Sequence, residues 1–340
     1  MKSIEIRGIS KDSQIMIGER IKNLDMYLSG KKPVIITDHN VYRHYGNIFT
    51  TDKVIRIGTG EGIKTLDTVR DIIGKLIGME IDRTAFIVGV GGGIVCDITG
   101  FIASIYERGL RFGFVSTTLL SQVDASVGGK NGVNFEGYKN MVGVFNQPEF
   151  VICDPDLLKT LPEKELLNGC AEIVKHAAIA DPELFNYLEE NFRGILGLDN
   201  EVIEKVVYDS VVIKSRIVNK DERETGERRK LNFGHTLGHA LEKVTGISHG
   251  EAVSIGMAAA AMASDKMGLL KRQDRIRLET LLKNLGLPIS MQADNEKIID
   301  AMGKDKKREK EKIHLILLEG IGNAVVREIA IQDLHGLITG

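Results

Sequence analysis

The stretch AFIVGVGGGIVCDITGFIASIY, Ala85–Tyr106, decides the fold of this 340-residue chain. An apolar, β-branched run leads into three glycines, Gly91–Gly93, and apolar residues at helical spacing follow. The pattern predicts a buried strand, a tight glycine turn and a helix. Backbone N–H groups at such a helix start bind anions, so the turn predicts a dinucleotide site with Asp38 and Asp97 near the ribose and the nicotinamide. The spacing is not the common GxGxxG, and glycine turns also serve close packing alone.

Short β-branched runs on both sides of this stretch alternate with amphipathic helical segments. Strands are predicted at Pro33–Asp38, Lys53–Gly58, Phe112–Thr118 and Phe150–Pro155, and a helix at Thr65–Met79. The alternation is typical of a parallel sheet covered on both faces. Beyond Pro155 the pattern is helical to about Leu285, and only residues 312–329 look extended again. We therefore predict an α/β, Rossmann-like N-terminal domain, residues 1–155, and a mainly α-helical C-terminal domain, residues 156–340.

Length and composition fit a cytosolic enzyme. The chain is too long for one core, its hydrophobic content of 43% is ordinary, and its net charge of -2 does not attract nucleic acid or anionic membrane. The N-terminus lacks the apolar run of a signal peptide, and no stretch approaches the roughly 20 apolar residues of a membrane-spanning helix. Cys96, Cys153 and Cys170 have no metal-ligand spacing. We predict a cytoplasmic location and no nucleic-acid or membrane partner.

The segment LNFGHTLGHALEKVTGISHGEAV, Leu231–Val253, contains three of the eight histidines. His235 and His239 are four residues apart, so they share one helix face, and His249 opens a second helix. Imidazole is the commonest ligand for a divalent metal, and a catalytic zinc takes three protein ligands and keeps an open position. Spacing alone favours His235 together with His239. The alternative is a surface or capping pair with no metal.

The segment NGCAEIVKHAAIA, Asn168–Ala180, predicts a largely buried helix that carries Glu172, Lys175 and His176 on one face. Glu and Lys are rarely buried without a partner, because removing water from a charge is costly. We favour Glu172 as a metal ligand with Lys175 beside it. The alternative is an unpaired trio on the surface.

A polar, glycine-rich segment, Thr117–Asn140, presents Asp124, Lys130, Lys139 and Asn140, which we predict to lie on loops. Loops with Lys and Gly commonly bind phosphate or carboxylate, although a solvated hairpin is the alternative. Arg108 follows a predicted helix, where its guanidinium suits an oxyanion. The run GKDKKREKEK, residues 303–312, is by default a solvated loop.

Six motifs together resemble the 3-dehydroquinate synthase family. In chain order they are GGGIVCDITGFIASIYERG, STTLLSQVDASVGGKNGVN, KNMVGVF, AEIVKHA, RRKLNFGHTLGHALE and HGEAV, and the resemblance runs from about Asp38 to Ala324. It implies that Glu172, His235 and His249 bind Zn²⁺, with Co²⁺ as an alternative, and that His239 faces the substrate or relays a proton. That ligand choice comes from the resemblance and not from the spacing.

The resemblance also implies the remaining site residues. Those around NAD would be Asp38, Asn40, Glu61, Lys64, Gly91, Gly92, Gly93, Asp97, Thr117, Thr118, Asp124, Lys139, Thr160, Leu161 and Glu165. The substrate phosphate would be held by Lys130, Asn140, Arg108 and either Lys306 or Lys307, which changes the interpretation of the charged run. The substrate carboxylate and ring hydroxyls would be held by Lys175, Lys214, Arg228 and Asn232. A homodimer is implied, with Arg108 reaching the phosphate site of the neighbouring subunit.

The activity implied by the resemblance is a lyase reaction of the shikimate pathway, which leads to the aromatic amino acids. 3-Deoxy-D-arabino-heptulosonate 7-phosphate would lose phosphate and close to 3-dehydroquinate through transient oxidation by NAD⁺, β-elimination, re-reduction and an intramolecular aldol step. A related cyclase such as 2-deoxy-scyllo-inosose synthase would need no carboxylate site, so Lys214 and Arg228 argue against it. A polyol dehydrogenase would need no phosphate site, so Lys130, Asn140 and Arg108 argue against that. The intact ligand set argues against a non-catalytic binding protein.

Overall fold

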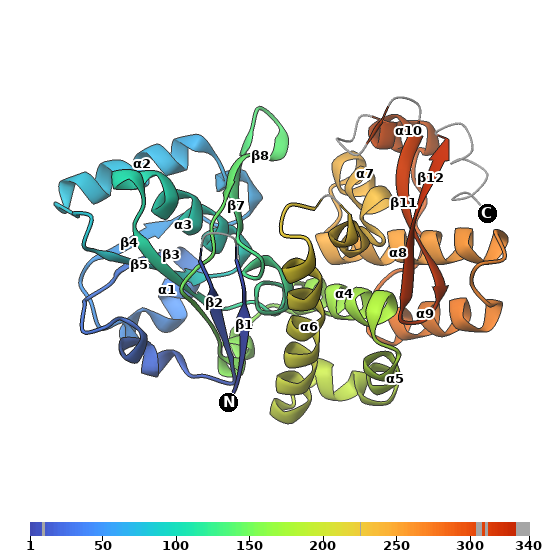
Figure 1. Ribbon diagram of the computed structural model, residues 1–340, viewed down its shortest axis with the longest axis horizontal. Coiled ribbons are helices and arrows are strands. Elements are labelled where there is room, and N and C mark those ends of the chain that lie inside the picture. Colours follow the sequence, from blue (N-terminus) through green and yellow to red (C-terminus); the bar gives the residue numbers. More distant parts are fainter. Residues whose placement is uncertain (9–10, 225, 304–307, 310–311, 331–340) are drawn as a thin grey trace. The chain divides into compact units, whose positions relative to one another are not determined.

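The computed structural model describes residues 1–8, 11–224, 226–303, 308–309 and 312–330. It divides into two compact units, Met1–Leu161 and Pro162–Gly340 (Figure 1). The division falls later than the predicted boundary after Pro155. The reason is that the 3₁₀ helix η6, Pro155–Thr160, packs on unit 1, where Leu157 belongs to the hydrophobic core.

Unit 1 is built on a seven-stranded sheet in the order β1-β2-β9-β6-β5-β3-β4. The five predicted strands are present and parallel: β3 Val34–Asp38, β4 Val54–Ile57, β5 Phe86–Gly91, β6 Arg111–Ser116 and β9 Phe150–Cys153. Two further strands, β1 Lys2–Ile6 and β2 Ser13–Ile17, form an antiparallel pair that the sequence pattern did not indicate. The helical segments of this unit are η1 Ile21–Tyr27, α1 His39–Tyr45, η2 Gly46–Ile48, η3 Glu61–Ile63, α2 Leu66–Gly78, α3 Gly93–Ile105, η4 Tyr106–Arg108, η5 Ser121–Ala125 and η6.

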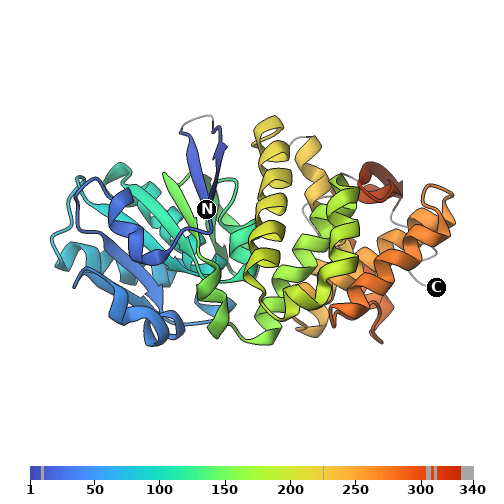
Figure 2. The same cartoon turned by 90° about the horizontal axis from the view of Figure 1, so that it is seen from below.

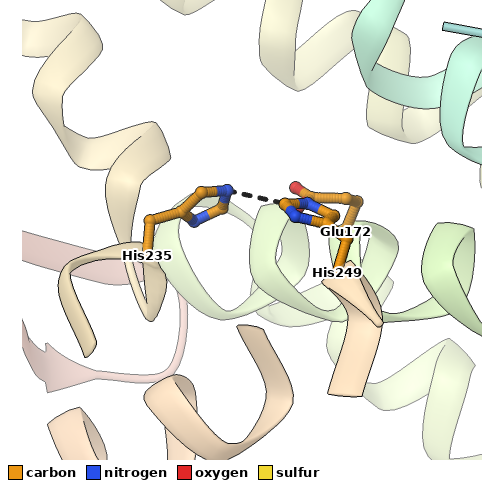
Figure 3. Close-up of side chains that lie close together, drawn as sticks. All are labelled: Glu172, His235 and His249. Atoms are coloured by element: carbon orange, nitrogen blue, oxygen red, sulfur yellow. Dashed lines mark hydrogen bonds and ion pairs between the residues drawn. The ribbon is translucent and has the colours of Figure 1, made fainter. Parts of the chain in front are cut away.

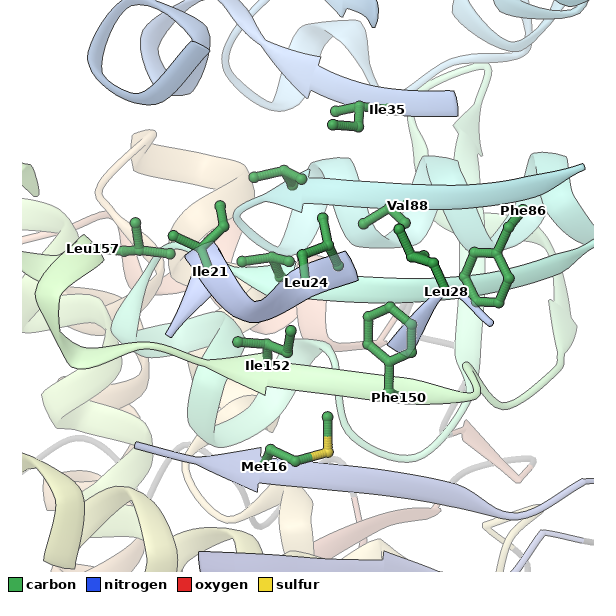
Figure 4. Packing of buried hydrophobic residues seen from close by; sticks show 12 residues of the cluster. Met16, Ile21, Leu24, Leu28, Ile35, Phe86, Val88, Phe150, Ile152 and Leu157 are labelled. Carbon is green, nitrogen blue, oxygen red and sulfur yellow. The ribbon is translucent and has the colours of Figure 1, made fainter. Parts of the chain in front are cut away.

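The core of unit 1 explains why its central strands are continuous apolar runs. Every residue of β5 is buried, as expected for a strand covered on both faces. Ile21, Leu24 and Leu28 of the η1 region pack over the central strands, where they belong to one cluster with Val88 and Ile152 (Figure 4). The sheet therefore provides a rigid base for the loops at its carboxyl edge.

The strand order changes direction at β3. This strand pairs with β4 on one side and with β5 on the other, and β5 in turn pairs with β6. The chain therefore adds β4 on one side of β3 and then returns to add β5 and β6 on the other side. In open α/β sheets, ligands bind at such a switch point, outside the carboxyl ends of the strands. Asp38 and Gly91 are the last residues of β3 and β5.

The prediction of loops for Asp124, Lys130, Lys139 and Asn140 was wrong. Asp124 lies in the short helical segment η5. Lys130 begins β7, Lys130–Phe135, and the other two lie in β8, Tyr138–Phe145, which pairs with β7 in a two-stranded antiparallel sheet. Gly132 and Gly143 face each other across this hairpin, and a Cβ on either would lie 2.6 Å from a carbonyl oxygen of the other strand. The glycines that suggested a loop thus serve close pairing of two strands.

Unit 2 is mainly helical, as predicted. Its helices are α4 Glu163–Ala180, α5 Pro182–Leu196, α6 Asn200–Lys220, η7 Glu227–Asn232, α7 His235–Thr245, α8 His249–Lys266, α9 Arg272–Asn284 and α10 Asn295–Gly303. The extended segment forms β11 Lys312–Gly320 and β12 Asn323–Ala330, with β10 Arg308–Glu309 beside β11. Figure 2 shows the helices of this unit side by side, and α4 packs against α5, α6 and α8. Among the described residues, no helix has the length and apolar character needed to cross a membrane.

Candidate functional site

Three helices of unit 2 bring Glu172, His235 and His249 together (Figure 3). The Nε2 atoms of His249 and His235 lie 2.9 and 3.4 Å from the same oxygen, Oε1 of Glu172. Glu172 comes from the middle of α4, while His235 and His249 are the first residues of α7 and α8. Residues that are far apart in the sequence therefore converge on one carboxylate.

Close helix packing places His235. Gly234, the residue before it, has a left-handed φ of 78°, and a Cβ there would lie 2.7 Å from the carbonyl oxygen of Val253 on α8. A Cβ on Gly256 would lie only 1.9 Å from the carbonyl oxygen of Gly234. Only glycine permits this approach of α8 to the start of α7. The two glycines thus bring the start of α7 close to α8.

The start of α8 is fixed in two ways. The Ser248 hydroxyl and the Glu251 carboxylate form a capping box, each accepting from the other's backbone N–H. In addition, the Gly250 N–H donates to Oδ1 of Asn168, 2.7 Å away, one helical turn before Glu172 on α4. His249 is therefore held at a helix end that is anchored to the helix of its carboxylate partner.

The electrostatics of the site favour an ionised carboxylate. Burial alone would raise the pKa of Glu172, but the ion-paired Lys175 ammonium and the His235 imidazole outweigh it and hold this pKa well below 4.5. Burial lowers the pKa of His235. Burial also opposes protonation of His249, but hydrogen bonds with Glu172 and Glu242 raise its pKa to about 10. The Lys175 ammonium and the protonated His249 imidazole thus compensate the buried charge of Glu172.

The donor set fits a divalent metal. One carboxylate oxygen and two imidazole nitrogens lie within 4.8 Å of one another. Zinc bonds of about 2.0–2.1 Å in tetrahedral arrangement place neighbouring donors about 3.3 Å apart, close to the observed separations from Glu172. Three protein donors leave one position open, as in catalytic zinc sites.

His239 is not one of the three residues whose donor atoms form this group. Its ring lies edge-on to that of His235, with centroids 5.3 Å apart, and its side chain is exposed. The spacing argument favoured His235 with His239, whereas the structure groups His235 with Glu172 and His249. Helix periodicity places two rings on one face but says nothing about a third residue from another helix. Two neighbours that the sequence reasoning did not single out are Asn168 and Glu242, although Glu242 lies seven residues after His235 and thus on the same face of α7.

The residues expected around the substrate carboxylate lie on elements that pack together. Lys175, Lys214 and Arg228 are buried and come from α4, α6 and η7, which contact one another, and Asn232 ends η7. Nη1 of Arg228 donates to the carbonyl oxygen of Glu222, 2.5 Å away. Nδ2 of Asn232 donates to Oε1 of Glu224, also at 2.5 Å. This region thus concentrates buried cations.

In unit 1, the glycine turn stands where it was predicted. Gly91 ends β5, Gly92 precedes α3 and Gly93 begins it. A Cβ on Gly91 would lie 2.5 Å from the Val95 side chain, and one on Gly92 would lie 2.9 Å from Thr118. Among the described residues no side chain caps this helix start, and side chains in place of the glycines would collide with their neighbours. The turn therefore fits a pyrophosphate at the N-terminus of α3.

Other predicted cofactor residues have contacts within unit 1. Oδ1 of Asp38 accepts from two backbone N–H groups and so caps α1. Lys64 is buried, pairs with Asp97 and donates to Oδ1 of Asn140 at 2.6 Å. Asn140, which was predicted to bind the phosphate, lies next to this predicted cofactor pair.

The remaining predicted residues are spread over both units. Glu61, Asn40, Lys139 and Thr160 are exposed in unit 1, Thr117 is buried, Thr118, Asp124 and Leu161 are half-buried, and Glu165 is exposed on α4 of unit 2. Lys130 and Arg108, from the predicted phosphate set, are exposed. Lys306 and Lys307 lie outside the described residues.

Comparisons with known proteins agree with the sequence motifs. Family models described as 3-dehydroquinate synthase N-terminal and C-terminal match residues 54–168 and 169–308. A 3-dehydroquinate synthase of Dehalococcoides mccartyi is 41% identical over 344 residues, which cover 96% of this chain and 96% of that protein.

Solved structures show the same fold. A 2-epi-5-epi-valiolone synthase from Streptomyces hygroscopicus subsp. jinggangensis, with NAD⁺ and Zn²⁺ bound, has a TM-score of 0.87 at 26% identity, covering 99% of this chain and 98% of that one. A 2-deoxy-scyllo-inosose synthase with carbaglucose-6-phosphate, NAD⁺ and Co²⁺ has a TM-score of 0.88 at 24% identity, covering 98% and 100%. From the family models and the near full-length relative, we conclude that this chain belongs to the 3-dehydroquinate synthase family.

Proposed function

We propose that this protein converts 3-deoxy-D-arabino-heptulosonate 7-phosphate to 3-dehydroquinate and phosphate, as a step of aromatic amino acid biosynthesis. The observation that carries the proposal is the convergence of Glu172, His235 and His249 in a chain whose relatives are 3-dehydroquinate synthases. The reaction needs a hydride carrier, a Lewis acid and two anion sites. The chain offers residues suited to each of these tasks.

Glu172, His235 and His249 would hold Zn²⁺, or Co²⁺ in its place, and the turn Gly91–Gly93 would hold the pyrophosphate of NAD⁺. When bound, NAD⁺ supplies reversible hydride transfer at carbon 5 of the substrate, and the metal supplies a Lewis acid for the oxygen on that carbon. The buried, ion-paired Lys175 keeps Glu172 ionised and so ready to bind a cation.

The residues of the helical unit would read the substrate carboxylate and ring hydroxyls. Arg228 and Lys214 are buried cations, and a buried carboxylate prefers a charged donor of this kind. Asn232 would donate to a ring hydroxyl, and His239 would relay a proton from its exposed position. Lys130, Arg108 and a lysine of the 306–307 pair would hold the phosphate group, and Asn140 would join them by leaving Lys64 when substrate binds. We assign no protein side chain as the base of the elimination, because the phosphate group itself can accept that proton.

The test of this activity is incubation of the purified protein with NAD⁺, Zn²⁺ and the heptulosonate phosphate. We expect release of inorganic phosphate in step with formation of 3-dehydroquinate, without accumulation of NADH. Phosphate release from glucose 6-phosphate, with none from the heptulosonate phosphate, would favour an inosose synthase instead. Accumulation of NADH without phosphate release would indicate a polyol dehydrogenase.

We also propose that the protein acts as a cytoplasmic homodimer in which Arg108 completes the phosphate site of the neighbouring subunit. Support comes from the turn that carries it. Glu107, Arg108 and Gly109 have positive φ angles of 49°, 64° and 124°, and the Arg108 side chain is exposed. Positive φ angles at two consecutive non-glycine residues raise the conformational energy of the backbone. Such strain is concentrated at functional sites.

Subunit mixing tests the shared site. Arg108→Ala and Lys130→Ala chains should each be inactive, because each removes a phosphate contact from every site. After equal mixing and re-pairing, half of the dimers are hybrids with one intact site of two, so about a quarter of the wild-type activity should return. Hybrids verified by differently tagged chains, but without activity, would contradict the shared site and leave the reaction itself untouched.

A further inference from the structure

Glu242 contacts His249 at the ring nitrogen that faces away from Glu172. Oε1 of Glu242 lies 3.1 Å from Nδ1 of His249, while Nε2 of the same ring lies 2.9 Å from Oε1 of Glu172. The side chain of Glu242 is only 9% exposed, against 27% for His249. The imidazole is therefore held between two carboxylates, one on each ring nitrogen.

We propose that Glu242 is a positioning residue for the metal centre, which orients His249 toward the cation. An ionised carboxylate can only accept, so the contact requires a proton on Nδ1 of His249. With the proton there, Nε2 presents its lone pair to the metal beside Glu172. A carboxylate behind a ligating histidine also fixes the plane of the ring and increases its basicity.

The second histidine of the site is oriented by a different group. Nδ1 of His235 lies 3.1 Å from the carbonyl oxygen of Phe233, which likewise can only accept. Both rings therefore direct Nε2 toward Glu172, His235 through its own backbone and His249 through a side chain. Only the second of these contacts can be removed by substituting one side chain, so it is open to direct test.

Glu242 also links the two helices that carry the histidines. It lies on α7, the helix that begins with His235, and it contacts the first residue of α8. Its contact thus holds the His249 ring relative to the helix of the other imidazole. A metal needs both donors at fixed positions, so loss of Glu242 should weaken binding without removing a ligand.

This inference rests on the proposed metal role of Glu172, His235 and His249. The variants to compare are Glu242→Ala and Glu242→Gln, with Glu251→Gln as the matched control. Glu251 lies at the start of α8, and its carboxylate contacts Ser248 and not the imidazole. Glutamine also serves at this position of a capping box, so Glu251→Gln removes the charge but keeps the cap that fixes the start of α8. Both glutamine variants remove one negative charge near the site.

The measurements are the Zn²⁺ affinity of each metal-free protein by chelator competition, the visible spectrum with Co²⁺, and the melting temperature without metal. Glu242→Ala should bind Zn²⁺ about 10- to 100-fold more weakly and change the Co²⁺ spectrum. Glu242→Gln should lose less Zn²⁺ affinity than Glu242→Ala, because its amide oxygen can still accept from Nδ1 of His249. Glu251→Gln should keep the wild-type affinity and spectrum.

Wild-type Zn²⁺ affinity in Glu242→Ala would overturn the proposal. An equal loss in Glu251→Gln would also overturn it, since any disturbance of the α8 start would then suffice. A lower melting temperature of metal-free Glu242→Ala with an unchanged Co²⁺ spectrum would assign Glu242 a structural role instead. The underlying metal site is checked separately: unchanged zinc content in His235→Ala and His249→Ala would refute the proposed site, whatever Glu242 does.

Discussion

Replacing Glu172 by glutamine should lower the free energy of unfolding of the metal-free protein and should also weaken its metal binding. The Glu172 side chain is fully buried and is ion-paired with Lys175, whose side chain is 2% exposed. Breaking a buried ion pair from one side costs about 3–5 kcal/mol, because the remaining charge stays in a region of low dielectric constant. The expected loss is in this range, since both side chains lie well inside the helical unit and His249 adds a second cation next to Glu172.

A double-mutant cycle tests the origin of that loss. Glu172→Gln with Lys175→Met removes both charges, and its destabilisation should be smaller than the sum of the two single changes by about 1 kcal/mol or more. The assay is urea denaturation in the presence of a chelator, followed by circular dichroism, which reports the helical unit. A loss below about 1 kcal/mol for Glu172→Gln, or strict additivity in the cycle, would refute the buried pair as a source of stability.

Three further outcomes follow from the structure. Arg228→Ala should lose about 2–5 kcal/mol of transition-state stabilisation, measured as kcat/KM on the heptulosonate phosphate, and wild-type kinetics would contradict a role in carboxylate binding. His239→Ala should lower kcat while the purified enzyme retains its zinc, and loss of zinc by elemental analysis would show that His239 is a ligand. Burial would raise the pKa of Glu149, but Arg111 and Lys11 outweigh it and lower this pKa below 4.5. The Glu149 contribution to stability is therefore present above pH 4.5 and is lost as the pH falls through the lowered pKa. Glu149→Gln should destabilise the protein at pH 7, and this destabilisation should disappear in acid. A stability difference between wild type and variant that grows in acid would contradict this sign.

The sequence predicted the elements whose signal is local. The five parallel strands are β-branched runs, and their burial on both faces makes each run continuous and easy to recognise. The antiparallel pair β1 and β2 was missed because its short strands, KSIEI and SQIMI, mix polar and apolar residues and depend on pairing for their structure. The hairpin of β7 and β8 was read as loops for a related reason, since its glycines serve contact across the pair.

The sequence predicted which types of residue form the site but not which of them lie close together. The buried helix with Glu172 and the histidine-rich segment were both evident as chemistry, because charged groups rarely occur in such apolar surroundings. Which histidine joins His235 depends on the distance between α7 and α8, which is set by contacts of glycine backbone. Helical spacing describes one helix at a time, so it pointed to His239. The resemblance named Glu172, His235 and His249, which the structure brings together, because a resemblance carries information about tertiary packing.

The contact between Gly234 and Gly256 defines what would have to be copied to build this centre elsewhere. A designer who grafted the carboxylate and the two imidazoles onto another helical scaffold would reproduce the proposed ligands but not the spacing of their helices. With alanine at the second glycine position, the added methyl would meet a carbonyl oxygen at 1.9 Å, and the helices would have to separate. The smallest transferable motif therefore contains five residues, of which two have no side chain. A random mutagenesis screen for zinc loss should accordingly recover substitutions at these glycines along with those at the ligands.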